Sequence, residues 1–191
     1  GTRIDIKNIY ALPISRSIPR VIEREDLWYT NPSAVLTLRY AVSEELKIEG
    51  ETGYRQRSPE VNELFSNGLH QGVSGIEEGD ADLQNETGYL SRLSASYHLN
   101  EKYFITASLY ENRIDDYIYL VPQEEVRLTI RGAFPVFDYE QVDARMRGLD
   151  LSFAAELGVH WRLRTDYSFL KGVEEESGLA LIGIPANNGG L

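Results

Sequence analysis

The sequence contains no cysteine, so the chain has neither a disulfide framework nor a cysteine-based metal site. It also lacks any apolar run as long as a membrane-spanning helix requires, about 20 residues. This does not exclude a membrane, because a transmembrane strand needs only about ten residues of alternating polarity. Basic residues are few: 19 Lys and Arg stand against 30 Asp and Glu, a formal net charge of −11. That balance argues against a nucleic-acid partner, which requires a basic face.

The chain does contain enough apolar sequence for one folded domain, since 42% of its 191 residues are hydrophobic. It has no signal peptide, and we expect it to be a piece of a longer protein. Apolar and polar residues alternate over most of its length, which is the pattern of strands with one wet face. The predicted strands are residues 3–12, 33–42, 46–54, 89–99, 103–120, 137–157 and 161–169.

The connections between these strands alternate in length. Short turns are predicted at 43–45, 99–101 and 158–160, and long loops at 13–32, 57–86, 121–135 and 172–186. Short turns at one end and long loops at the other are typical of outer-membrane β-barrels. The pattern therefore predicts an all-β fold, an antiparallel up-and-down meander. A soluble barrel or sandwich alternates in the same way and stays an alternative, but the loop asymmetry favours the membrane barrel.

The longest interruption of the alternation runs from Tyr54 to Glu86. A loop of this length is uncommon in a compact domain and is usually functional or disordered. This one contains Leu64, Phe65 and other apolar residues, which a disordered linker would have in smaller number. We therefore predict a large ordered loop that makes contacts, held by the flanking strands.

Several pieces of the chain, in order, resemble one family. They are TNPSAVLTLRY (30–40), GYRQRSPEVNELFSNGLHQG (53–72), IEEGDADLQNET (76–87), YENRIDDYIYL (110–120), RGLDLSF (147–153) and YSFLKG (167–172). Together they resemble the C-terminal barrel segment of TonB-dependent outer-membrane receptors, including zinc, haem and siderophore receptors. The piece RQRSPEVNELFSNGLH is the most specific.

The resemblance implies a barrel of about 22 antiparallel strands in the bacterial outer membrane, plugged by an N-terminal domain. It implies uptake of a scarce nutrient, powered by the TonB complex, which acts through the plug. Residues 1–191 would supply about seven or eight strands, with the plug and the C-terminal strands outside the chain. Outer-membrane lipid is then an expected partner. No integral cofactor is expected, and the cargo candidates are zinc, haem and a ferric siderophore. A passive porin and a soluble carbohydrate-binding β-domain are the rival functions.

Two boxes of this family lie in the long loop. Arg57-Ser58-Pro59 resembles the arginine-alanine-proline box, and residues 79–83 resemble the asparagine-proline-x-leucine box. Haem receptors carry a histidine between these boxes, where His70 stands in this chain. Zinc receptors similarly resemble RSPEVNELFSNGLH followed by acidic residues. Ser58 and Ala81 depart from the usual residues, as does Gln56, which weakens the haem assignment more than the family assignment.

His70 is the leading candidate for contact with the cargo, because neutral imidazole ligates zinc and haem iron. The candidate metal site comprises His70, Glu77, Glu78 and Asp80, and the further candidate ligand-binding residues are Arg57, Glu63, Tyr117 and Arg131. Imidazole must be unprotonated to ligate, so affinity is expected to fall below about pH 6.5. The alternative is a solvated acidic loop with a surface histidine. No catalytic constellation emerges from the spacing, so we do not expect an enzyme.

Overall fold

The computed structural model describes residues 1–11, 25–70, 72, 74–100, 102–158, 160–181, 184 and 187–190. Its strands are β1 (Thr2–Ala11), β2 (Glu25–Ala41), β3 (Leu46–Arg57), β4 (Asn67–His70), β5 (Gly75–Glu78), β6 (Glu86–Leu99), β7 (Tyr103–Thr129), β8 (Gly132–Glu156), β9 (Arg162–Glu174) and β10 (Asn187–Gly190). The helix α1 (Val61–Phe65) lies between β3 and β4. Within these ranges no helix is long and apolar enough to cross a membrane.

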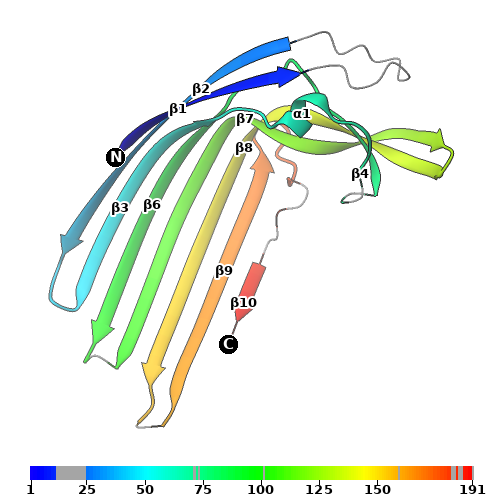
Figure 1. The fold of residues 1–191 in the computed structure, drawn as a ribbon. Coiled ribbons are helices and arrows are strands. Elements are labelled where there is room, and N and C mark those ends of the chain that lie inside the picture. The colour runs from blue at the N-terminus through cyan, green and yellow to red at the C-terminus, as the bar shows by residue number, and fades with distance from the viewer. Residues whose placement is uncertain are drawn as a thin grey trace.

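The main strands form one antiparallel meander, in the order β1-β2-β3-β6-β7-β8-β9-β10 (Figure 1). Short turns join the strands at one end, and α1, β4 and the far part of the β7–β8 hairpin lie at the other end. The predicted all-β up-and-down fold is confirmed. One local exception is parallel: β5, which also pairs with β4, aligns Ile76, Glu77 and Glu78 with Val136, Phe137 and Asp138 of β8.

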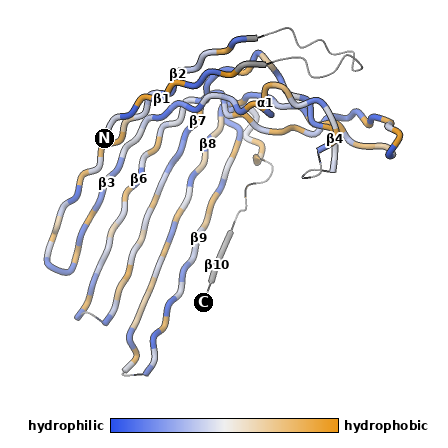
Figure 2. Tube along the Cα trace, in the orientation of Figure 1, coloured by the Kyte–Doolittle hydropathy of each residue, from blue (hydrophilic) through white to orange (hydrophobic). Residues whose placement is uncertain are grey.

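The alternating sequence gives the sheet two chemically different faces, because successive side chains of a strand point to opposite sides. On one face the register places Leu93 of β6 opposite Leu109 of β7, and Leu109 opposite Leu149 of β8. These leucines belong to an apolar face, on which Leu109 is 58% exposed. On the polar face, Ser94 and Ser108 lie opposite each other and share a hydrogen bond of 2.9 Å. Figure 2 shows the resulting alternation of hydropathy along the strands.

The predicted loops are wrong in part, since residues 172–174 belong to β9 and the loop 57–86 contains β4 and β5. Residues 121–135 were expected to form a loop, but β7 continues to Thr129 and β8 begins at Gly132, so they form a long hairpin. The pairing of this hairpin has register shifts between Ile114 and Tyr117 and between Pro122 and Val126. Residues 25–32 of the predicted loop 13–32 also belong to a strand, β2, and residues 12–24 lie outside the described part of the chain.

The long loop at residues 58–85 is ordered and packs on the polar face of the sheet. Lys7 of β1 donates a hydrogen bond to the carbonyl of Pro59 (2.9 Å). Tyr29 of β2 donates one to the carbonyl of Leu83 (3.4 Å). Apolar residues from β1, the loop and β7 form a buried cluster beneath it: Ile9, Leu64, Leu83 and Ile118. The core of this end of the molecule therefore lies between the sheet and the loop, as the prediction of a contact-making loop requires.

Candidate functional site

The end of β3 is tied to the loop through Arg57. Its guanidinium lies 2.6 Å from the carboxylate of Glu86 on β6 and 3.0 Å from that of Glu63 in α1. Glu86 is buried, and it also accepts a hydrogen bond from the backbone N–H of Ile118 (2.8 Å). Glu63 additionally accepts one from the backbone N–H of Glu60 (2.7 Å), which caps the helix. The two sequence candidates Arg57 and Glu63 therefore bind each other and organise three strands and α1.

His70 lies on a short hairpin formed by β4 and β5. Its Nδ1 is 2.9 Å from Oε1 of Glu77 on β5. The two side chains differ in environment: that of His70 is 64% exposed, whereas that of Glu77 is 6% exposed. The structure thus brings together two of the four candidate metal residues, one facing solvent and the other buried beneath it.

The second oxygen of Glu77 is also engaged. The hydroxyl of Tyr139 on β8 donates a hydrogen bond to Oε2 of Glu77 (3.3 Å). The same hydroxyl accepts a hydrogen bond from the side-chain amide of Asn62 in α1 (3.3 Å). Burial, and secondarily the negative charge of Glu77, raise the pKa of Tyr139, so the phenol keeps its proton and remains a donor. Tyr139 and Asn62 were missed at the level of sequence, because nothing local indicates that β5 pairs with β8.

The remaining metal candidates have other partners. Glu78 lies 2.6 Å from the guanidinium of Arg127, which also contacts Glu125 (3.0 Å). Asp80 accepts a hydrogen bond from the backbone N–H of Asp82 (2.9 Å) within its own turn. In the part of the chain that the structure describes, no group of three or more His, Asp or Glu residues could hold a metal ion. Among the described residues, the exposed imidazole of His70 therefore does not belong to a group of side chains that could enclose a metal ion.

The other ligand candidates do not converge on His70. Arg131 is exposed at the tip of the β7–β8 hairpin, where its backbone N–H donates a hydrogen bond to the hydroxyl of Thr129 (3.1 Å). Tyr117 stacks on Tyr119, with ring centroids 6.2 Å apart, and packs against a cluster that includes Ile114. Tyr117 thus has a packing role, and Arg131 takes part in the turn through its backbone.

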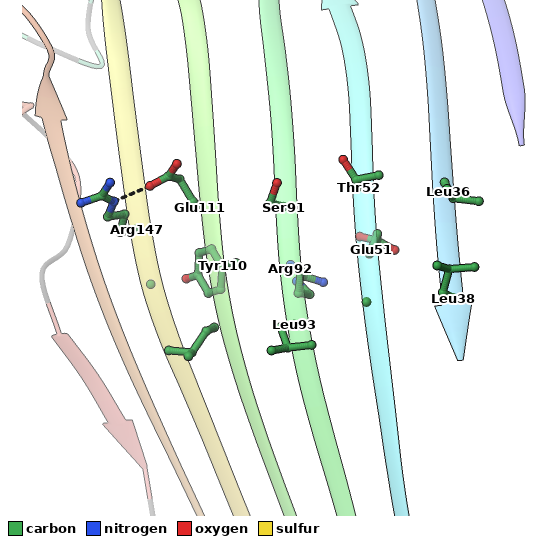
Figure 3. A pocket seen from close by; sticks show the side chains of 13 residues that line it. Leu36, Leu38, Glu51, Thr52, Ser91, Arg92, Leu93, Tyr110, Glu111 and Arg147 are labelled. Atoms are coloured by element: carbon green, nitrogen blue, oxygen red, sulfur yellow. Dashed lines mark hydrogen bonds and ion pairs between the residues drawn. The ribbon is translucent and has the colours of Figure 1, made fainter. Parts of the chain in front are cut away.

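The two faces of the sheet each carry a hollow. A groove of about 580 Å³ lies on the apolar face over Gly50, between Leu38 and Leu93, with the ion pair of Glu111 and Arg147 at its rim (Figure 3). A second hollow, of about 500 Å³, is lined by other residues than the first, among them Gly53, Gly88 and Arg55. His70 lines neither of them. The candidate contact is therefore an exposed side chain on the loop.

The comparisons with known proteins agree with this architecture. The profile of the family described as "TonB dependent receptor-like, beta-barrel" matches residues 11–191. No curated protein matches the chain. Among solved structures, the copper transporter OprC has 21% identity and a TM-score of 0.68, with 86% of this chain and 24% of that chain covered.

Two other solved structures are similar at lower identity. The siderophore receptor PirA from Pseudomonas aeruginosa has 13% identity and a TM-score of 0.58, with 78% of this chain and 29% of that chain covered. The Serratia marcescens hemophore receptor HasR, solved as a double mutant with its hemophore HasA and heme, has 16% identity and a TM-score of 0.58, with 89% and 29% covered. The chain thus spans less than a third of these solved relatives, and the likeness shows a shared fold.

Proposed function

Because the chain belongs to the family of TonB-dependent receptor-like β-barrels, we propose that it is part of an outer-membrane importer of a scarce, metal-containing nutrient, driven by the TonB complex. The family and the solved relatives are receptors and transporters, not enzymes. The observation that carries the proposal is the division of the sheet into an apolar face and a polar face that also receives the long loop.

The apolar face is the surface that contacts lipid in this proposal. Aromatic residues mark both of its limits: the rings of Tyr54 and Tyr89 lie 5.5 Å apart toward the loop end, and Tyr97 and Tyr103 lie near the short turns. Interfacial aromatic girdles on both sides of an apolar band are typical of transmembrane barrels. The polar face then lines the interior, and the loop at 58–85 lies across that interior.

A pair of neighbouring substitutions tests the membrane assignment. Leu109→Arg places a charge on the apolar face, which costs about 2–4 kcal/mol at the middle of a bilayer. Ser108→Arg places the same charge on the polar face and should be tolerated. The measurement is insertion and folding of the full-length receptor in lipid vesicles. Equal folding of the two variants would contradict the assignment.

His70 is the proposed first contact with the cargo. Its imidazole is exposed and contacts only Glu77 of the candidate metal residues, whereas Glu78 and Asp80 have other partners. A single nitrogen ligand suits a metal whose other positions are already filled, as in haem or a metal chelate. A bare zinc ion, by contrast, is usually held by three or four protein ligands. Haem or a chelated metal is therefore the favoured cargo, and free zinc is the second candidate.

Two experiments test this proposal in the full-length receptor. Uptake of haem or of the chelate should be lost in cells that lack the TonB complex, and unchanged uptake would rule out energised transport. Calorimetry with haem and with Zn²⁺ should show weaker binding of haem by His70→Ala. If both affinities match those of the parent, His70 is a surface histidine, and an organic chelate recognised by other side chains becomes the better candidate.

A further inference from the structure

Glu77 is an unusual residue for an acidic loop, because its carboxylate is almost completely removed from solvent. A buried carboxylate is costly unless it is paired and hydrogen-bonded. Both of its oxygens have partners: Oε1 faces Nδ1 of His70 and Oε2 receives the hydroxyl of Tyr139. The parallel pairing of β5 with β8 fixes the backbone on which Glu77 stands. The carboxylate is thus held in one place from below and presents one oxygen to the imidazole.

This contact determines which ring nitrogen of His70 carries a proton. An ionised carboxylate can only accept hydrogen bonds, so the nitrogen that faces it at 2.9 Å must donate. Nδ1 is therefore the protonated nitrogen, and in the neutral ring the lone pair belongs to Nε2. A histidine that ligates a metal usually donates its other N–H to a carboxylate or carbonyl in this way, which fixes the ring and increases its basicity.

We propose that Glu77 is a positioning residue: it holds Nδ1–H of His70 so that Nε2 is the atom that meets the metal of the cargo. The inference rests on the proposed function for the identity of the ligand, a metal with one open position and its other positions filled. Glu77 itself does not ligate the metal, because its oxygens face His70 and Tyr139. The pair therefore differs from the mixed carboxylate and histidine metal site that the sequence indicated.

The first test needs no ligand. In the full-length receptor labelled with ¹⁵N-histidine, at about pH 8, where imidazole in general is neutral, the ring of His70 should be in the Nδ1–H form. Glu77→Leu removes the acceptor and should abolish this preference, while Glu77→Gln keeps an oxygen acceptor and should retain part of it. Glu140→Gln is the control. It removes a charge from the strand that carries Tyr139, but Glu140 accepts a hydrogen bond from Gln123 (3.0 Å) and the substitution should have no effect on the tautomer of His70. An Nε2–H ring in the parent protein would overturn the proposal.

The second test measures affinity for haem. The absorption spectrum of the bound haem shows at the same time whether an imidazole ligates its iron. Loss of a group that orients a metal ligand typically lowers affinity by about 10- to 100-fold. Glu77→Leu should therefore weaken haem binding by about that factor, with partial recovery in Glu77→Gln. In a His70→Ala background the same Glu77 substitutions should change nothing further, because a positioning residue acts only through the group that it positions.

The outcomes distinguish failure of the cargo contact from failure of the positioning role. If His70→Ala leaves both haem and Zn²⁺ affinity unchanged, the cargo contact of the proposed function fails and the positioning role fails with it, and the tautomer measurement then tests only the contact between Glu77 and Nδ1 of His70. If His70→Ala weakens binding but Glu77→Leu behaves like Glu140→Gln, only the positioning role fails. Should Glu77→Leu destabilise the loop, Tyr139→Phe removes the hydroxyl that donates to Oε2 and accepts from Asn62, and leaves Oε1 facing His70. This variant should shift affinity in the same direction, and an unchanged affinity would count against the proposal.

Discussion

The guanidinium of Arg57, the last residue of β3, pairs directly across the strands with the carboxylate of Glu86, the first residue of β6, at 2.6 Å. This pair stands where the barrel-type sheet ends and the long loop begins. Because Glu63 of α1 shares the same guanidinium, the pair also determines where the loop leaves the sheet. The arginine box that the sequence indicated is thus a structural junction.

Removal of Arg57 should be costly. Arg57→Ala leaves the buried Glu86 without its cation, and breaking a buried ion pair costs about 3 kcal/mol or more. The matched control is Arg39→Ala, since Arg39 pairs with Glu49 on the same sheet but is exposed, and the loss there should be below about 1 kcal/mol. Urea unfolding of the receptor in detergent measures both. Equal losses would show that Glu86 does not depend on Arg57.

A glycine on β8 is required by a tyrosine on β7. Tyr110 lies opposite Gly148, and a Cβ at Gly148 would meet Cζ of Tyr110 at 2.1 Å. Gly148→Ala should therefore destabilise the sheet by about 1–3 kcal/mol through overpacking. Gly50→Ala is the control, because a Cβ at that position meets nothing within 4 Å. Unfolding midpoints of the two variants should differ, and Tyr110→Ala should restore the stability of Gly148→Ala.

The loop at 58–85 should be released when its central apolar contact is removed. Leu64 of α1 is fully buried, and truncation of a buried leucine to alanine costs about 2–5 kcal/mol. Val61 on the same helix is 55% exposed, so Val61→Ala should change stability by less than about 0.5 kcal/mol. Hydrogen exchange of the loop amides should accelerate in Leu64→Ala alone. Similar exchange in the two variants would mean that the loop is held by its polar contacts.

The β7–β8 hairpin should be sensitive to pH through Asp138. Burial, followed by the negative charges of Glu78, Glu140 and Glu125, raises the pKa of Asp138. Its Oδ1 is buried and lacks a hydrogen-bond partner among the described residues. A carboxyl whose folded pKa is raised is most favourable when protonated, so its contribution to stability is present at low pH and is lost as pH rises through the folded value.

Asp138→Asn keeps the side chain neutral at every pH. The variant should therefore match the parent below about pH 4, the ordinary range of aspartate, and become the more stable of the two as pH rises. Thermal unfolding midpoints measured from acid to neutral pH provide the comparison. Two curves that stay parallel over that range would contradict a role for this carboxyl.

Much of the fold could be predicted because it depends on local pattern. The alternation of Leu149, Leu151 and Phe153 determines which side of β8 is apolar, and no distant residue is needed to read it. The short turns are also local, since Asn100 and Gly158 adopt positive φ angles there (51° and 88°). The meander and its turns follow from these two signals.

The long hairpin could not be predicted because its prolines suggest a loop. Pro122 borders a register shift. Proline is tolerated at such an irregularity, because the hydrogen bond that its missing N–H cannot donate is less needed there. At the candidate site, His70 was singled out from its place between two motifs and Glu77 was expected to ligate metal, and contact of His70 with a cargo stays a prediction. The burial of Glu77 depends on the pairing of β5 with a strand some 60 residues further along the chain, and the local sequence gives no signal of that pairing.

The parallel pairing of β5 with β8 has a mechanical consequence. A paired strand that slides by one residue turns every side chain to the opposite face, so the nearest equivalent arrangement lies two residues away, about 6.6 Å. Glu77 therefore keeps its place opposite Phe137, within reach of Tyr139, while the pairing lasts. The contact between Glu77 and the imidazole of His70 therefore depends on this register, and loss of the pairing would break it.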